Sequence, residues 1–177
     1  QNIVDEKYDM KKLIITKALR SGYKNPAQIA HKVLADRIGK RDAGSKPSPG
    51  DRVAYVYIEN PNKRALQGDR IETPEYIREN NIPINYAFYM TNQIMKPVQQ
   101  VFALVLEKLG DFKKRKGHTL RKWKKELAEL RRSYPDPMTY KKKEDALRNK
   151  EVKAILFDKY LQQTCLAGNQ NIMKFFM

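Results

Sequence analysis

The sequence has little that bonds covalently or binds metal tightly: one cysteine, Cys165, and two histidines, His31 and His118, among 177 residues. A single cysteine excludes an internal disulfide framework, and these three residues cannot complete a closed zinc site. The longest apolar run, residues 101–106, is far too short to span a membrane. No basic start followed by an apolar stretch marks a signal peptide. We therefore expect no membrane partner.

Motifs for phosphate and metal chemistry are also absent. Two-metal phosphoryl transfer needs converging carboxylates, and the chain contains no pair of acidic residues separated by a single residue. It has no Walker-type glycine loop and no dinucleotide-binding fingerprint. We expect no catalytic residue, no metal site and no cofactor in this chain.

The abundant feature is positive charge. The chain holds 36 Lys and Arg against 20 Asp and Glu, a formal net charge of +16. Residues 11–50 carry 10 basic and 2 acidic side chains, and residues 111–150 carry 15 and 6, whereas residues 71–110 nearly balance. Clustering of this kind is the electrostatic pattern of a polyanion binder. The alternative is a solvated surface, but +16 exceeds what solubility requires.

The pattern of residues predicts a mainly α fold with a small β element. A β-branched run at 13–16 and the run VAYVYI at 53–58 predict strands, the second too apolar on both faces to be an exposed edge. Asn25-Pro26 predicts the start of a helix over 26–38, which Gly39 ends. A loop rich in Gly and Pro follows at 39–51.

Later helices are predicted by caps and apolar spacing. Thr73-Pro74-Glu75 begins one helix, and Asn85 caps another that breaks or kinks at Lys96-Pro97 and continues to Gly110. Apolar residues at 120, 123, 127 and 130 predict an amphipathic helix with a basic outer face, ended at 135–137. A last helix is expected over 144–162. We expect Trp123 and the aromatic residues at 86–89 to pack in the core.

Three spaced motifs between residues 10 and 109 carry a resemblance to a known family. The first is LIITK at 13–17, with Tyr23 and QIAHKVLADR at 28–37. The second is KRD at 40–42 with PGDRVAYV at 49–56. The third is NYAFY at 85–89 with QIMKP at 93–97. In this order they resemble the thumb subdomain of family B DNA polymerases, most closely the delta-like branch of replicative and large-DNA-virus enzymes.

The resemblance implies that the chain is part of a larger DNA-directed DNA polymerase, a nucleotidyltransferase. In that family the palm, with the aspartates that bind Mg²⁺, precedes the thumb, so palm and fingers are expected partners supplying the chemistry. The start at Gln1 agrees with a fragment. Cellular delta subunits add two cysteine-rich metal modules, which a chain with only Cys165 lacks. We therefore expect a large-DNA-virus polymerase, acting in the nucleus or in a viral replication compartment in the cytoplasm.

The family's thumb holds the primer–template duplex behind the active site. Because the DNA sequence changes at every step, its contacts are expected to go to phosphate and sugar. Lysine and arginine suit this role because they neutralise phosphates and release counterions. The residues we expect to bind DNA surround the first long helix and the Gly/Pro loop: Lys17, Arg37, Lys40, Arg41, Lys46 and Arg52.

The C-terminal tail resembles the sliding-clamp-binding box of many replicative polymerases. Its residues are Asn169, Ile172, Phe175 and Phe176, with Asn169 where the family normally has Gln. A register shifted by one, from Gln170 to Met177, stays open. Such a box places one aliphatic and two aromatic side chains in an apolar pocket. The alternative is a tail that packs on its own domain.

The sequence thus predicts a thumb-like DNA-gripping domain at 1–110, a basic helical extension at 111–167 and a clamp-binding tail at 168–177. Whether the basic block at 111–150 also contacts DNA stays open. The alternative function is a free-standing basic helical protein that binds nucleic acid, and a purely structural interaction domain is a third.

Overall fold

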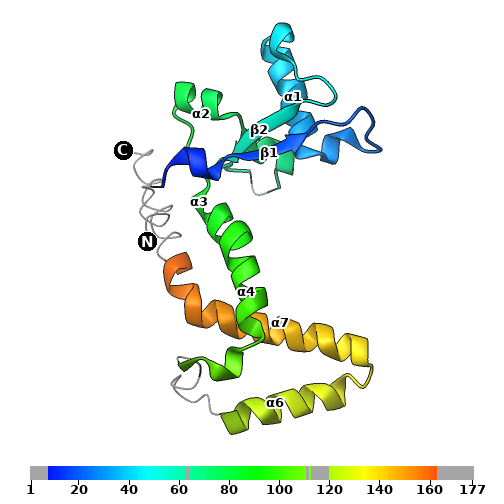
Figure 1. Ribbon diagram of the computed structural model, residues 1–177, viewed down its shortest axis with the longest axis vertical. Coiled ribbons are helices and arrows are strands. Elements are labelled where there is room, and N and C mark those ends of the chain that lie inside the picture. The colour runs from blue at the N-terminus through cyan, green and yellow to red at the C-terminus, as the bar shows by residue number, and fades with distance from the viewer. Residues whose placement is uncertain (1–7, 63, 111, 113–119, 163–177) are drawn as a thin grey trace. The chain divides into compact units, whose positions relative to one another are not determined.

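The computed structural model describes residues 8–62, 64–110, 112 and 120–162. The chain divides into two compact units, Gln1–Tyr89 and Met90–Met177. The predicted fold class is confirmed, because the described residues are mainly helical with one small antiparallel sheet (Figure 1). The predicted domain limits at residues 110 and 167 stay predictions.

Unit 1, Gln1–Tyr89, is built on a three-stranded sheet with the order β1-β2-β3. Its strands are β1 (Ile15–Ala18), β2 (Arg52–Tyr57) and β3 (Ile71–Glu72). β2 is the central strand and pairs antiparallel with both neighbours. The prediction that this apolar strand is not an edge is confirmed.

Both faces of β2 are covered, because successive side chains of a strand point to opposite sides. On one side, Val53 and Tyr55 pack with Leu34 of helix α1 (Ala30–Arg41) in a buried cluster. On the other side, Val56 packs with Ile77 of helix α2 (Pro74–Asn80). The sheet therefore fixes α1, which carries three of the six predicted DNA-binding residues.

Two predicted helix starts are confirmed by their capping bonds. The Thr73 hydroxyl accepts a hydrogen bond from the Tyr76 backbone N–H at 3.3 Å, at the start of α2. The Asn85 side chain accepts one from the Phe88 N–H at 2.8 Å, at the start of α3 (Tyr86–Phe88). Both bonds satisfy backbone donors that a helix start leaves unpaired.

Several predicted boundaries near the N-terminus are wrong. The strand begins at Ile15 instead of 13, because a 3-10 turn, η1 (Met10–Leu13), buries Leu13. The helix expected at 26–38 is a 3-10 turn, η2 (Pro26–Gln28), followed by α1. Gly39 does not end α1, which runs to Arg41. A Cβ added at Gly39 would lie 2.7 Å from Lys46 Cδ, so the lysine stem occupies the space that glycine leaves open.

Unit 2, Met90–Met177, begins within a π-helix, η5 (Tyr89–Met95), that leads into α4 (Lys96–Ala103). The break predicted at Lys96-Pro97 is a change from π-helix to α-helix, with Pro97 in the first turn of α4. Proline is tolerated there because a residue in the first turn of a helix does not need its backbone N–H for an intrahelical hydrogen bond. The helix does not reach Gly110, because a 3-10 turn, η6 (Leu106–Lys108), follows and buries Leu106 completely.

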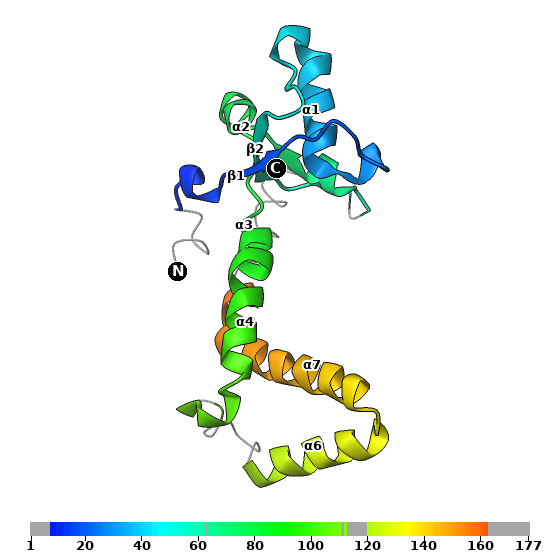
Figure 2. The same ribbon diagram turned by 45° about the vertical axis from the view of Figure 1, so that its right-hand side comes forward.

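A helical hairpin completes unit 2. Helices α6 (Leu120–Ser133) and α7 (Pro137–Leu156) lie side by side (Figures 1 and 2). The predicted end of α6 at the Pro135-Asp136-Pro137 segment is confirmed. α7 begins earlier than the predicted 144, because Asp136 caps it by accepting a hydrogen bond from the Thr139 N–H at 2.8 Å. The core prediction for Trp123 is confirmed, since it is 1% exposed and packs edge-on against Phe112.

Candidate nucleic-acid interface

The two predicted arginines of α1 are engaged by a buried carboxylate. Glu72 of β3 is only 2% exposed. Its Oε2 accepts hydrogen bonds from Arg41 at 2.7 Å and from Arg37 at 3.3 Å. Arg37 also donates to the carbonyl oxygens of Gly68 at 2.7 Å and Ile71 at 3.0 Å. These bonds tie α1 to β3 and to the turn before it, η4 (Gln67–Arg70).

Arg41 has a second contact, with its guanidinium 3.5 Å from the centre of the Tyr76 ring. The hydrogen bond to Glu72 raises the pKa of Arg41 and so stabilises its charged form. A cation between a buried anion and an aromatic face is held in one geometry. The structure therefore brings Arg37 and Arg41 together around Glu72, and the prediction that they bind DNA stays a prediction.

The two predicted lysines near the end of α1 are more accessible. Lys40 is exposed, and its side chain makes no ion pair or hydrogen bond within the described residues. Lys46 is exposed and lies 3.6 Å from the Asp36 carboxylate, a long ion pair. The hydrogen bond from Lys32, rather than this pair, is the main cause that lowers the pKa of Asp36. A surface pair at this distance is weak, so the Lys46 amine stays available to a stronger anion.

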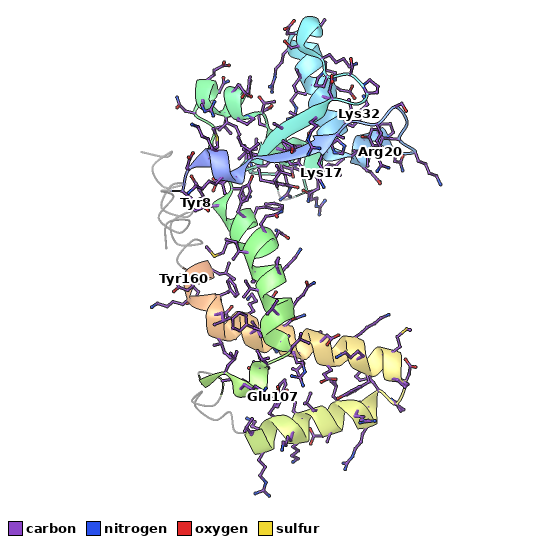
Figure 3. All side chains as sticks on the ribbon, viewed as in Figure 1. Tyr8, Lys17, Arg20, Lys32, Glu107 and Tyr160 are labelled. Carbon is purple, nitrogen blue, oxygen red and sulfur yellow. The ribbon has the colours of Figure 1, made fainter. Side chains whose placement is uncertain are left out.

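Two more predicted cations lie on adjacent strands. Lys17 on β1 is opposite Val53, and Arg52 on β2 is opposite Ala18. Both side chains are exposed, and Arg52 donates to the Thr16 hydroxyl at 2.9 Å. Figure 3 shows Lys17 on β1 and Arg20 on the loop that follows it. The register therefore puts these two cations, 35 positions apart in the sequence, on neighbouring strands but on opposite faces of the sheet, Lys17 on the face of Val53 and Arg52 on the face of Ala18.

The Gly/Pro loop is ordered by its own hydrogen bonds. The Gly44 N–H donates to the Asp42 carboxylate at 3.0 Å, and the Ser48 N–H donates to Asp51 at 2.8 Å. Gly50 has a positive φ of 100°, which favours glycine, and its N–H donates to the Leu19 carbonyl at 2.8 Å. These three amides are engaged within the protein, so side chains are the candidates for phosphate contact.

His31 has a structural environment. Its Nε2 lies 3.0 Å from the Tyr23 hydroxyl, which accepts a hydrogen bond from the Arg20 N–H at 2.8 Å. Burial, then the charge of Lys17, lowers the pKa of His31, so the ring is neutral at pH 7. These contacts satisfy His31 within the protein and indicate a structural role. Arg20, which sequence reasoning omitted, also acts on His31 by its charge. The only sequence signal that pointed to Arg20 is the excess of basic residues at 11–50, to which it belongs.

The aromatic residues near the unit boundary pack in the core, as predicted. Tyr89 is 3% exposed, and its hydroxyl accepts a hydrogen bond from the Tyr57 N–H at 2.9 Å. Burial raises the pKa of Tyr89 to about 12. Phe88 stacks on Tyr57 with ring centres 3.5 Å apart. Tyr89 is therefore not available to stack on nucleic-acid bases.

Unit 2 contains a half-buried ionic network that sequence reasoning did not find. Arg148 of α7 lies 2.8 Å from the Glu107 carboxylate and 2.9 Å from that of Glu144. Trp123 of α6 donates its indole N–H to Glu107 at 3.0 Å. Figure 3 shows Glu107 where η6 meets the hairpin. Only the i,i+4 spacing of Glu144 and Arg148 was visible in the sequence.

Some predicted features lie outside the described residues. These include the four predicted clamp-binding residues, Asn169, Ile172, Phe175 and Phe176. Within the part of the chain that the structure describes, no group of three or more His, Cys, Asp or Glu side chains is placed to hold a metal ion. No helix among the same residues is long and apolar enough to cross a membrane.

Comparison with known proteins places these features in a family. Residues 1–105 match the family described as DNA polymerase family B. A DNA polymerase of Pyramimonas orientalis virus is 43% identical over 181 residues, covering 99% of this chain and 15% of that protein. A DNA polymerase of Acanthamoeba polyphaga mimivirus is 41% identical over 138 residues, covering 68% of this chain and 8% of that protein.

Cellular relatives match a shorter part of the chain. The DNA polymerase delta catalytic subunit of Schizosaccharomyces pombe is 46% identical over 110 residues, covering 59% of this chain and 10% of that protein. The chain therefore spans between 8% and 15% of the length of these three relatives.

Proposed function

This chain belongs to DNA polymerase family B, and we propose that it is the thumb-like part that holds the primer–template duplex by its phosphate backbone during replication. The observation that carries the proposal is the state of Lys17 and Lys40. Both lie within the matched residues and are exposed, and neither side chain makes an ion pair or hydrogen bond within the described residues. Phosphate contacts fit a duplex whose sequence changes at every step.

The six predicted cations divide into two roles. Lys17, Lys40, Lys46 and Arg52 are the phosphate ligands, because their charges are exposed and at most weakly paired. Arg37 and Arg41 hold α1 against β3 through Glu72, and so keep Lys40 in place between them. Each phosphate contact releases a counterion, which accounts for roughly an eightfold gain in affinity at 0.1 M salt.

The test is the triple substitution K17Q/K40Q/R52Q in the 177-residue chain. Loss of three phosphate contacts weakens binding to a primer–template duplex roughly 500-fold at 0.1 M salt. The control K11Q/R64Q/R78Q removes the same charge from exposed positions of the same unit. Fluorescence anisotropy with a labelled duplex measures both. Equal losses in the two variants would mean that only net charge matters, and would overturn the assignment of these residues.

We also propose that the tail docks a sliding clamp through Asn169, Ile172, Phe175 and Phe176. Aromatic anchors of this kind contribute most of the binding energy in peptide recognition. The variant F175A/F176A is expected to abolish clamp binding and to leave affinity for DNA unchanged, as measured by surface plasmon resonance on immobilised clamp and duplex. The variant M177A tests the shifted register. Clamp binding that survives F175A/F176A would remove this part of the proposal.

The parent polymerase supplies the chemistry in this proposal. Because the chain spans at most 15% of the three relatives named above, we assign nucleotidyl transfer, with its Mg²⁺ ions, to the palm and fingers. Those parts are the proposed partners of this chain. The proposed place of action is the nucleus or a viral replication compartment in the cytoplasm, because the relatives are cellular delta subunits and viral DNA polymerases.

A further inference from the structure

Helix α6 has an apolar face and a basic face. Trp123 and Leu127 face the core of unit 2, where they pack with Leu147 and Val152 of α7. The fourteen residues of α6 include six basic and two acidic side chains, and all six basic residues are exposed. Figure 3 shows long side chains projecting from α6 on the side away from α7. The helix therefore presents a basic face that its own packing does not need.

Three cations on this face have no partner among the described residues: Arg121, Lys124 and Arg132. The other exposed cations on α6 do interact. Lys125 lies 3.8 Å from Glu129, and Arg131 lies over the Tyr140 ring. At 100° per residue, positions 121, 125, 128 and 132 fall within a narrow stripe, with 124 beside it. The stripe from 121 to 132 is about 16 Å long, at 1.5 Å per residue.

The composition of the stripe favours a phosphate backbone over other anionic partners. Its exposed face carries no aromatic residue, so it lacks the stacking platform that single-strand binders use. At its centre lies Ala128, which leaves room for close approach of the partner. A membrane-surface helix would need large apolar residues along the same face, and only Leu120 at the end of α6 is both large and exposed.

We infer that the outer face of α6 is a second binding surface for the phosphate backbone of double-stranded DNA. The inference rests on the proposed function and adds to it a surface outside the family match, which ends at residue 105. Arg121, Lys124 and Arg132 each neutralise a phosphate, and Lys125 exchanges its long ion pair with Glu129 for a fourth. These contacts read no base, so they strengthen binding to any duplex sequence equally.

The test is R121Q/K124Q/R132Q in the 177-residue chain. Loss of three phosphate contacts lowers duplex affinity roughly 500-fold at 0.1 M salt and reduces the slope of log affinity against log salt by about 2.7. The control K108Q/K150Q/K159Q removes the same charge from exposed positions of unit 2. We expect the control to keep most of the wild-type slope. Circular dichroism spectra check that both variants fold, since the substituted residues are on the surface.

The outcomes separate this inference from the proposed function. If the wild-type chain binds duplex with a steep salt slope and R121Q/K124Q/R132Q keeps that slope, the α6 surface is refuted and the proposed function stands. If the wild-type chain does not bind duplex, both the α6 surface and the proposed function are refuted. A triple variant that keeps its duplex affinity but loses binding to vesicles of phosphatidylserine would overturn the inference in favour of a membrane surface.

Discussion

The arginines of α1 in unit 1 and those of α6 in unit 2 have similar charge but different surroundings. Arg37 and Arg41 share one carboxylate, Glu72, whose side chain is 3% exposed. Arg121 and Arg132 project from α6 without an acidic partner among the described residues. A guanidinium beside a buried carboxylate is held to the protein, whereas an unpaired surface guanidinium can bind an external anion. The presence or absence of an acidic partner in the protein therefore decides whether an arginine stabilises the fold or is available to bind DNA.

Each unit also has an ionic network that joins its elements, buried around Glu72 in unit 1 and half-buried around Arg148 in unit 2. Glu72 joins α1 to the sheet in unit 1, and Arg148 joins α7 to η6 in unit 2 through Glu107. In each case removal of one partner leaves a charge uncompensated, at greater cost beside the buried Glu72 than beside the half-buried Glu107. We expect both networks to determine stability, and the exposed cations to determine binding.

The largest expected effect on stability is that of E72Q. Within the described residues, loss of the carboxylate leaves Arg41 without an acidic partner and Arg37 with only the exposed Asp69, 3.3 Å away. We expect unit 1 to lose about 3 kcal/mol of unfolding free energy. Urea unfolding followed by far-UV circular dichroism measures the loss. The matched control is E75Q, an exposed position on α2, which should change stability by less than about 0.5 kcal/mol. If E72Q and E75Q lose the same unfolding free energy, Glu72 does not hold Arg37 and Arg41 to the protein.

A smaller effect is expected from acid on unit 2. Burial alone would raise the pKa of Glu107, but hydrogen bonds from Arg148 and Trp123 outweigh burial and lower this pKa below the ordinary 4.5. A depressed carboxylate pKa contributes stability that is complete above the unfolded-state pKa and is lost as pH falls through the folded-state pKa. We therefore expect unit 2 to weaken below about pH 4.5.

Trp123, the only tryptophan in the chain, reports on this unit by its fluorescence. Urea midpoints measured between pH 7 and pH 3 should fall with pH in the wild type and less in R148M. The control E129Q, at an exposed position of α6, should follow the wild type. A wild-type midpoint that does not change with pH would contradict the role of the Glu107 network.

Local signals in the sequence predicted much of the fold. Thr73 and Asn85 were found because a cap depends only on residues within the next turn. The central position of β2 followed from its apolar character on both faces. The boundary errors occur where packing differs from the local pattern: Leu13 is buried by a 3-10 turn, and Gly39 lies inside α1, where the Lys46 stem occupies the space beside it.

The candidate site was harder to predict than the fold. Charge counting identified the basic segments and most of their exposed cations. It did not show that Lys40 is unpaired among the described residues while Arg37 is bound to a carboxylate. That difference depends on Glu72, which is 35 positions away from Arg37 in the sequence. Contacts over this distance come from the β2–β3 pairing and the packing of α1, and no local pattern in one sequence reports them.

The most direct test of the central claim is the salt dependence of duplex binding by the 177-residue chain, measured on two primer–template duplexes of unrelated sequence. If six to ten phosphates are neutralised, affinity falls roughly 10³–10⁵-fold between 50 and 200 mM salt, equally for both duplexes. A flat salt response, or a strong preference for one sequence, would contradict a grip made through the phosphate backbone.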